Sequence, residues 1–548
     1  MKKITFILFT ILFSLCVGPV AAQYRIIVER DTMVKAKLGG NISLGSREVK
    51  FIAYDYPSKD ADGKAVTVSG VIMIPSDIVN GKVPCDGIIM YNHPTIGSPK
   101  DAPSQSGDAL EAISAIMSNP LKPNYIIVAS DYIGYGSSIN HNVSYISGDT
   151  NGRNALDGLL AAKKLFEDRQ IPQGKFLFNM GFSQGGTESM FAAKLTDTEA
   201  KYKGIRFDKT FSGGGPLDFE QIYSIYVKRD VCDDIADVVL MLISVNENYH
   251  LGINYKDIFK EPMASKALEY FHAKDKSVVS EIGVTSMDHI SQVLQPDFMN
   301  LESEPAKKLR AKLKEISLVE GWEPDITKNY YIEHSRHDNY VPIQSVRSII
   351  PWMRDKGFQP SIVPGKSSLQ TCTAVFKLKH QQSAIVWAIQ TLAAIQFWPV
   401  LYYEGEQNRY FHDIVYDMNL LKVIKTLESL GIDLKKIINQ GGLSRAPYQL
   451  PTHYTAFDLI PNISDILGKV DLTTDDLEEM CDDAGITQTD LVMAYLYVKS
   501  DASAAPAPEQ SLEERIDGPL YLLRSYEQQL ANWFMLGGFD VNYSLWGN

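Results

Sequence analysis

Cysteine is scarce in this sequence, and its spacing excludes the common metal-binding patterns. Five cysteines occur in 548 residues, and no two of them form a C-x-x-C pair. Cys16 lies near the N-terminus, and the other four are far apart, at Cys85, Cys232, Cys372 and Cys481. This spacing indicates neither a zinc site nor a disulfide framework, although an exported chain could form one or two bridges.

Basic residues are also fewer than acidic ones. The chain has 53 Lys and Arg residues against 66 Asp and Glu residues, which gives a formal net charge of −13 at pH 7. The acidic excess is spread over the chain, whereas proteins that bind nucleic acid or anionic membranes usually carry a basic patch. We therefore expect neither nucleic acid nor an anionic membrane as the main partner.

Long apolar runs are few, and the first of them lies at the N-terminus. Residues 1–22 combine two lysines, a short apolar run and a small-residue end, which predicts a secretory signal peptide cleaved after Ala22. An uncleaved anchor is the alternative, but the run is short and no stop-transfer flank follows it. The residues before Cys16 are not the small ones that a lipoprotein signal needs. We expect the mature chain to be periplasmic or secreted.

A second apolar run spans residues 383–403. It is interrupted by Gln390, Gln396 and Pro399, so a buried helix is a better interpretation than a membrane span. We therefore expect no stable membrane span once the signal peptide is removed.

From residue 23 onward, the order of strand and helix signals is that of an α/β domain. Residues 23–77 alternate apolar and polar side chains, as antiparallel strands do. The short apolar runs 87–91 and 125–130 are typical of strands buried on both faces of a parallel sheet, and 152–166 has helical periodicity. This alternation predicts a doubly wound α/β fold, with a mostly parallel sheet and helices on both faces.

The alternation is interrupted once and then ends. We predict an α/β core in two parts, 23–215 and 329–403, separated by a helical cap or lid insertion at 216–328. Such an insertion would lie above the strand ends, where ligands bind. Its helix 234–249 is apolar nearly all round, which suits either a packed subdomain helix or a lid that lines an acyl pocket. The remaining residues, 404–548, are predicted to be mostly helical and have no assigned role.

The motif G-F-S-Q-G, centred on Ser183, is the first sign of chemistry. A G-x-S-x-G pattern should arise by chance about 0.2 times in a chain of this length, so its context has to decide. It lies between the strand-like segment 175–180 and the helix-like segment 187–195, as in a nucleophile elbow. A serine that only packs a tight turn is the alternative, but the flanking elements favour a nucleophile.

A serine nucleophile needs a base and an acid that orients the base. In this architecture the chain order is serine, then Asp or Glu, then histidine. Asp338 lies in a polar loop after the strand-like segment 329–334, and it is the predicted acid. His380 precedes the helix-like segment 383–398 and is the predicted base.

Other histidines are weaker candidates for the base. His334 and His337 flank the acid, but a base there would break the expected order; we expect His334 to end the strand and His337 to be a solvated loop residue. His412 and His453 lie in the additional C-terminal region. The histidines at positions 141, 250, 272 and 289 precede the acid in the chain and are expected at the surface, in the insertion or near substrate.

The negative charge that forms during acyl transfer needs two hydrogen-bond donors. Gln184 directly follows the serine and should supply one N–H group. The second should come from the loop after strand 87–91, which reads N-H-P-T-I-G. Pro94 has no N–H group, so Thr95 is the better candidate, through its N–H group or its hydroxyl.

Together these residues resemble the α/β-hydrolase superfamily and, within it, the secretory lipase family of exported lipases and esterases. The resemblance covers roughly residues 24–400 and rests on Y-N-H-P-T, S-D-Y-I-G-Y-G-S-S, G-F-S-Q-G-G, S-G-G-G-P-L-D and H-D-N-Y-V-P. It implies serine-dependent hydrolysis of a lipid or other small ester, with Ser183, Asp338 and His380 as the catalytic triad. It also implies a helical cap over the acyl site. This chemistry calls for no metal and no organic cofactor.

Two alternatives share parts of this pattern. A serine peptidase of the prolyl oligopeptidase type has the same elbow and triad order, but it places a propeller or long β domain before the hydrolase domain. Only about 60 residues lie between the predicted signal peptide and strand 87–91 here. A hydrolase-fold binding protein with an inert site would normally lack one triad member, and all three candidates are present. The acyl chain length, the natural substrate and the oligomeric state are not specified by the sequence.

Overall fold

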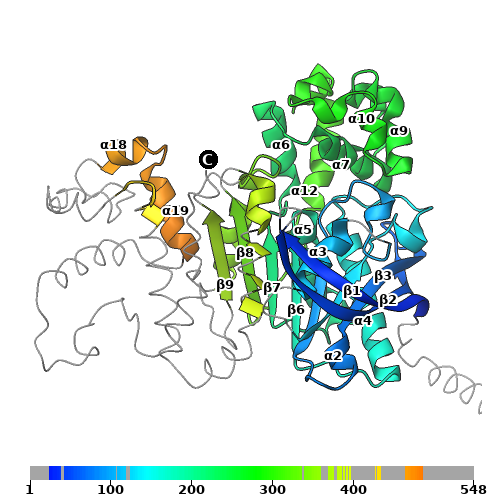
Figure 1. Cartoon of the computed structure of the whole chain (residues 1–548). Coiled ribbons are helices and arrows are strands. Elements are labelled where there is room, and N and C mark those ends of the chain that lie inside the picture. The colour runs from blue at the N-terminus through cyan, green and yellow to red at the C-terminus, as the bar shows by residue number, and fades with distance from the viewer. Residues whose placement is uncertain are drawn as a thin grey trace, which may run out of the picture. The chain divides into compact units, whose positions relative to one another are not determined.

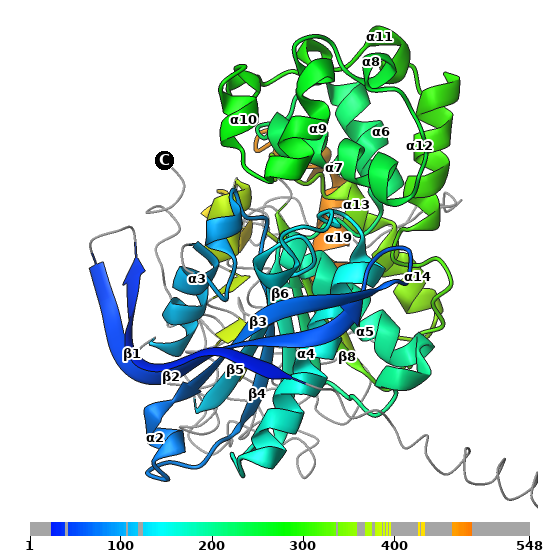
Figure 2. The same cartoon turned by 90° about the vertical axis from the view of Figure 1, so that its right-hand side faces the viewer.

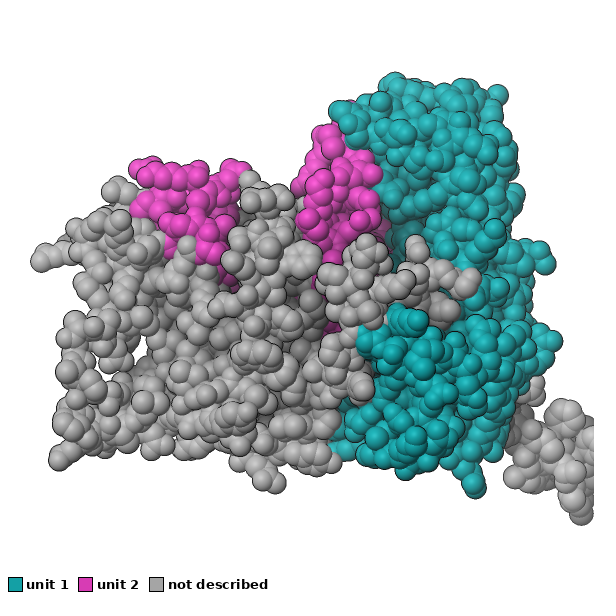
Figure 3. Space-filling view, viewed as in Figure 1, with its two compact units in different colours: residues 1–180, 188–204, 234–316 teal, residues 181–187, 205–233, 317–548 magenta. Residues whose placement is uncertain are grey.

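The fold is described from a computed structural model, and the chain in it divides into two compact units (Figure 3). The first unit comprises residues 1–180, 188–204 and 234–316, and the second comprises residues 181–187, 205–233 and 317–548. The structure describes residues 24–38, 42–105, 108–118, 124–335, 338–358, 368–374, 379–385, 387–388, 391–392, 394–395, 426–427, 429–432 and 463–484.

The sheet of the first unit begins antiparallel and continues with a parallel pair. Its strands are β1 (Arg25–Leu38), β2 (Ile42–Lys59), β3 (Ala65–Pro75), β4 (Gly87–Asn92), β5 (Tyr125–Ser130) and β6 (Phe176–Phe182). They lie in the order β1-β2-β3-β5-β4-β6. The pairs β1–β2, β2–β3 and β3–β5 are antiparallel, whereas β4 and β5 are parallel. Figure 2 shows β1 and β2 as a long curved hairpin.

The helices of the first unit cover this sheet because small residues and buried strands allow close packing. Its helical segments are α2 (Ser76–Val79), η1 (Pro99–Asp101), α3 (Asp108–Met117), η2 (Gly136–Ser138), α4 (Gly148–Asp168), α5 (Gln184–Thr198) and η3 (Ala200–Tyr202). Helix α3 packs against β1, and α4 packs against β2, β3 and β5. Strands β4 and β5 are buried along their whole length, as expected for strands covered on both faces. A side chain on Gly152 of α4 would come within 2.9 Å of the Ala192 nitrogen in α5, so this glycine permits the contact.

The same unit contains a helical part, residues 234–316. Its segments are α7 (Ile235–Asn248), α8 (Tyr255–Ile258), α9 (Met263–Ala273), α10 (Ser277–Ser280), η4 (Val284–Ser286), η5 (Ile290–Gln292), α11 (Pro296–Met299) and α12 (Glu304–Glu315). Helix α7 begins at a side-chain cap, because Asp234 accepts a hydrogen bond from the Asp237 N–H. Twelve of the 14 residues of α7 are buried, and α9 and α12 pack against it. Its apolar character is thus explained by packing within the unit.

The second unit contains the end of β6 and the start of α5 (residues 181–187) and three further strands that run parallel. Its strands are β7 (Lys209–Gly213), β8 (Asn329–Ser335) and β9 (Ser368–Ala374), in the order β7-β8-β9. Its helices are α6 (Phe219–Arg229), α13 (Gln344–Arg347), α14 (Ile349–Asp355), α18 (Ile463–Gly468) and α19 (Thr474–Ala484). Helical residues also occur at 380–385, 387–388, 391–392 and 394–395. Helix α19 lies beside β9 (Figure 1).

Some sequence predictions lie outside the described residues. The signal peptide (1–22) does so entirely, and the C-terminal region (404–548) does so except for 426–427, 429–432 and 463–484. Residues 234–316 fall in the first unit, while the two ends of the predicted insertion (216–328) fall in the second, so its boundaries stay a prediction. Among the described cysteines, Cys85 is half-buried, and Cys232 and Cys481 are buried. No helix within the described ranges is long and apolar enough to cross a bilayer.

Candidate active site

Ser183 lies at a sharp turn between a strand and a helix. Strand β6 ends at Phe182 and helix α5 begins at Gln184, which leaves Ser183 alone between them. Its φ angle is +57°, in the left-handed region that costs a non-glycine residue roughly 1–2 kcal/mol. The turn is held by two backbone hydrogen bonds: the Ser183 N–H donates to the Gly213 carbonyl at 2.8 Å, and the Gly186 N–H donates to the Ser183 carbonyl at 2.9 Å. Strain at one residue that its surroundings hold in place is frequent at functional sites.

Close packing requires glycine at Gly186, the residue after the G-x-S-x-G motif. A Cβ atom on Gly186 would lie 2.5 Å from the Gly213 carbonyl oxygen. A Cβ atom on Gly215 would likewise lie 2.6 Å from the Thr187 nitrogen. The elbow therefore packs directly against the backbone that follows β7, and these glycines allow it.

The three predicted triad residues come together in the second unit. Nε2 of His380 lies 2.9 Å from Oγ of Ser183, and Nδ1 of His380 lies 2.6 Å from Oδ2 of Asp338. Asp338 and His380 are buried, and Ser183 is partly exposed. The three side chains thus form one continuous chain of hydrogen bonds, with the hydroxyl at its accessible end.

Asp338 is held in its orientation by the loop in which it lies. Its Oδ1 atom accepts hydrogen bonds from the N–H groups of Tyr340 (2.9 Å) and Val341 (2.7 Å), which leaves Oδ2 to His380. Burial raises the pKa of the Asp338 carboxyl, but the hydrogen bond and the charge of His380 outweigh it, helped by the charge of His334. The pKa of Asp338 is therefore below its ordinary value, and the carboxylate stays ionised at neutral pH.

Comparisons with known proteins place the chain in a known fold. No protein-family model and no curated protein matches the sequence. Among solved structures, one neighbour is a protein of Legionella pneumophila assigned only provisionally as a hydrolase, with a TM-score of 0.56 and 17% identity. The match covers 70% of this chain and 99% of that one. Another is the rice cell wall degrading esterase LipA from Xanthomonas oryzae, with a TM-score of 0.54 and 17% identity, covering 72% of this chain and 100% of that one.

The chain has the α/β-hydrolase fold. This finding confirms the fold predicted from the sequence. The finer resemblance to secretory lipases stays a prediction, because likeness at such low identity shows the fold alone.

The two oxyanion candidates of this hydrolase fold lie in different units. Gln184 is the first residue of α5, and its side chain is buried. Thr95 belongs to the first unit, in the loop after β4, where its Oγ1 lies 3.0 Å from the Tyr145 hydroxyl. The imidazole of His93, two residues earlier, is fully buried and stacks on Tyr132 at a centroid distance of 4.1 Å. Their roles as donors stay predictions.

Two residues that the sequence reasoning missed adjoin the triad. The side-chain oxygen of Asn339 accepts a hydrogen bond from the backbone N–H of His380 at 3.0 Å, and its side-chain nitrogen donates one to Asp233. The ring of Tyr340 stacks on the imidazole of His380. Both residues belong to the H-D-N-Y-V-P segment that points to the acid, but their sequence spacing carries no signal for contacts with a residue 40 positions away.

The other histidines of the acid loop have different positions. His334 lies within β8 and is buried, and its Nε2 lies 2.8 Å from the Val341 carbonyl oxygen. The same nitrogen is 3.7 Å from Asp338, farther than the 2.6 Å contact that His380 makes. His337, His412 and His453 lie outside the described residues.

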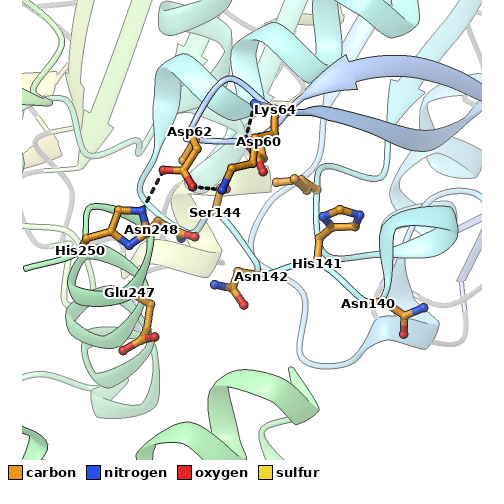
Figure 4. A pocket seen from close by; sticks show the side chains of 12 residues that line it. Asp60, Asp62, Lys64, Asn140, His141, Asn142, Ser144, Glu247, Asn248 and His250 are labelled. Carbon is orange, nitrogen blue, oxygen red and sulfur yellow. Dashed lines mark hydrogen bonds and ion pairs between the residues drawn. The ribbon is translucent and has the colours of Figure 1, made fainter. Parts of the chain in front are cut away.

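A pocket of about 280 Å³ lies in the first unit and is polar (Figure 4). It is formed by the β2–β3 turn, the loop around His141 and the end of α7. At its edge Asp62 accepts a hydrogen bond from the Lys64 side chain and pairs with His250 at 2.8 Å. No candidate triad or oxyanion residue lines this pocket, and its polar lining does not suit an acyl chain.

In the part of the chain that is described, no group of three His, Cys, Asp or Glu side chains could hold a metal ion.

Proposed function

We propose that this protein is an exported serine-dependent hydrolase of carboxylic esters, either a lipase or an esterase. The observation that carries the proposal is the hydrogen-bonded chain from Ser183 through His380 to Asp338. A serine hydroxyl is a weak nucleophile near neutral pH, and a positioned imidazole is what makes it reactive. The left-handed backbone at Ser183 adds independent support. The lowered pKa of Asp338 agrees with the proposal but follows from the same contact with His380.

The proposed reaction has two halves. In the first, His380 takes the proton of Ser183 as the oxygen attacks the acyl carbonyl, and then gives that proton to the leaving alcohol. Asp338 holds the Nδ1–H tautomer of His380 and stabilises the imidazolium ion. In the second half, His380 activates a water molecule that releases the acid from the acyl-enzyme.

The negative charge of the tetrahedral intermediate needs donors that are already in place. In this proposal the N–H group of Gln184, at the N-terminus of α5, is one donor, and Thr95 is the other. Removing one such donor typically costs about 3–4 kcal/mol of transition-state stabilisation. No metal or organic cofactor takes part in these steps.

One structural neighbour, LipA from Xanthomonas oryzae, is an esterase, and this supports an ester substrate rather than a peptide. A prolyl oligopeptidase-type peptidase remains the competing enzyme class, and an inert binding protein the competing non-enzyme class. A panel of p-nitrophenyl esters from acetate to long acyl chains, measured beside dipeptide amides, would separate these possibilities.

The decisive test is the replacement of the nucleophile. Ser183→Ala should lower kcat on an activated ester by at least about 10³-fold and should abolish labelling by a fluorophosphonate probe. Ser265→Ala, at an exposed position on α9, serves as the matched control and should keep both. Retention of activity or labelling in Ser183→Ala would place the nucleophile elsewhere.

N-terminal sequencing of the protein recovered outside the cytoplasm tests cleavage after Ala22.

A further inference from the structure

The imidazole of His380 lies against two aromatic rings. The ring of Tyr340 is stacked on it, with centroids 5.2 Å apart and planes at 25°. The ring of Phe182 contacts it at 4.9 Å and 46°. Phe182 in turn contacts Trp387, in the helical segment that follows His380, at 5.6 Å. His380 itself is only 5% exposed, so these rings replace water as its surroundings.

The backbone of Tyr340 is fixed on both sides, which sets the place of its ring. Its N–H group donates to Oδ1 of Asp338 at 2.9 Å, and its carbonyl accepts a hydrogen bond from the hydroxyl of Tyr226 on α6. Tyr226 is buried, so this anchor is shielded from water. The carboxylate that orients His380 therefore also places the ring that stacks on it.

The proposed reaction makes His380 positively charged at each proton transfer. The face of an aromatic ring attracts a cation within about 6 Å, by roughly 0.5–1 kcal/mol when exposed and 2 kcal/mol or more when desolvated. The attraction is stronger where water is excluded, since water no longer screens the charge. A ring stacked on a buried imidazole thus favours the charged form of that imidazole over the neutral form.

We propose that Tyr340 is a positioning residue that stabilises the imidazolium form of His380 through its ring face. The inference rests on the proposed function, because it assigns the ring a role only if His380 is the catalytic base. The charged and titratable groups nearby are kept constant in the test. Asp338 contacts Nδ1 of the imidazole, and His334 lies 3.7 Å from that carboxylate. Lys379, the preceding residue, pairs with Asp233 at 3.8 Å.

The test compares variants that keep or remove the ring. Tyr340→Leu removes it, and Tyr340→Phe retains it as the conservative rescue. Tyr255→Leu is a matched control, because Tyr255 also stacks on an aromatic ring (Phe259, 6.2 Å and 14°) but lies in the helical part of the first unit. Active sites are counted by fluorophosphonate titration, so that unfolded protein does not enter the rates.

The expected result is a shift in the pH profile. In Tyr340→Leu the acid limb of kcat/KM should move to lower pH by about half a unit to one unit, and kcat on the plateau should fall about three- to tenfold. Tyr340→Phe should restore the acid limb, and Tyr255→Leu should have the profile of the unaltered protein. A Tyr340→Leu profile with an unmoved acid limb, or an equal shift in Tyr340→Phe, would overturn the proposal.

This failure differs from failure of the proposed function. If Ser183→Ala retained activity or labelling, the triad itself would be refuted, whatever the Tyr340 variants showed. If the unaltered protein were labelled at Ser183 and Tyr340→Leu had the same pH profile as the unaltered protein, only the role proposed for Tyr340 would be refuted.

Discussion

Nε2 of His380 lies 2.9 Å from Oγ of Ser183, although 197 positions separate the two residues in the chain. The contact depends on three local features: the left-handed turn at Ser183, the carboxylate of Asp338, and the backbone anchor of His380 on Asn339. Each feature can be changed on its own. The expected effects differ. Replacing Asp338 changes the tautomer of His380, replacing Asn339 changes the position of the His380 ring, and a substitution beside Ser183 changes the turn.

The proposed acid of the triad, Asp338, can be tested by an isosteric change. Asp338→Asn should lower kcat by about 10⁴-fold, because an amide no longer favours the Nδ1–H tautomer that leaves Nε2 free to accept a proton. The pKa of Asp338 lies below its ordinary value, so its titration should not set the acid limb of the activity profile in the range where His380 is expected to titrate as the base. Steady-state kinetics on an activated ester would measure both effects.

The matched control for this change is Asp325→Asn. The pKa of Asp325 is also lowered despite burial, by hydrogen bonds from Thr327 and by nearby positive charge, but this residue does not contact His380. Its replacement should change kcat by less than about twofold. An Asp338→Asn variant with a tenth of the original activity or more would mean that another acid orients the base.

Asn339 offers a second, milder test. Its side chain accepts the N–H group of His380 and donates to Asp233, so Asn339→Ala removes an anchor of the base without touching the triad. We expect kcat to fall about tenfold, since a small displacement of a catalytic group is costly. Asn140→Ala, at an exposed position beside the polar pocket, is the control and should be nearly silent. Equal kcat values in the two variants would show that Asn339 does not position His380.

The sequence was most informative where a rule links residue order to geometry. The alternation in residues 23–77 predicted the antiparallel strands, and the order serine, acid, histidine selected three residues that the structure brings together. Contacts without such a rule were missed. Nothing in the sequence pairs Asn339 with the backbone of His380, because that contact depends on how two loops end.

The glycines of the elbow show the same limit. The motif G-x-S-x-G draws attention to the glycine two residues after the serine, Gly185. In the structure the close approach is at Gly186, where a Cβ atom would lie 2.5 Å from the Gly213 carbonyl oxygen. The partner strand β7 begins 23 residues farther along the chain, so only the folded structure reveals which glycine packs against it.

This packing predicts a strong effect of one methyl group. Gly186→Ala should lower thermal stability and reduce kcat at least about tenfold, because either the elbow or the backbone after β7 has to move. Gly204→Ala is the matched control, since a Cβ atom there would have no neighbour within 4 Å. That variant should change the free energy of unfolding by no more than about 0.5–1 kcal/mol. Differential scanning calorimetry and ester kinetics on both variants would check this, and similar behaviour of the two would contradict it.

Buried His93 predicts a loss of stability in acid. Burial lowers the pKa of His93 to about 4, from about 6.5 in an unfolded chain. Above pH 6.5 neither state binds the proton, and between pH 6.5 and pH 4 the unfolded state binds it while the folded state does not. Stability should therefore fall as the pH falls through this window, by roughly 2 kcal/mol from this residue between pH 7 and pH 4.5.

Replacing His93 by phenylalanine should remove this part of the pH dependence. The ring can still stack on Tyr132, as the imidazole does at 4.1 Å, although the hydrogen bonds of His93 are lost and stability at pH 7 will be lower. The informative quantity is the difference in unfolding free energy between pH 7 and pH 4.5, measured by urea titration. His93→Phe should lose less stability over this interval than the unaltered protein, whereas His272→Phe, at an exposed position on α9, should lose as much. Equal losses in all three proteins would mean that His93 gains its proton in the folded state as readily as in the unfolded chain.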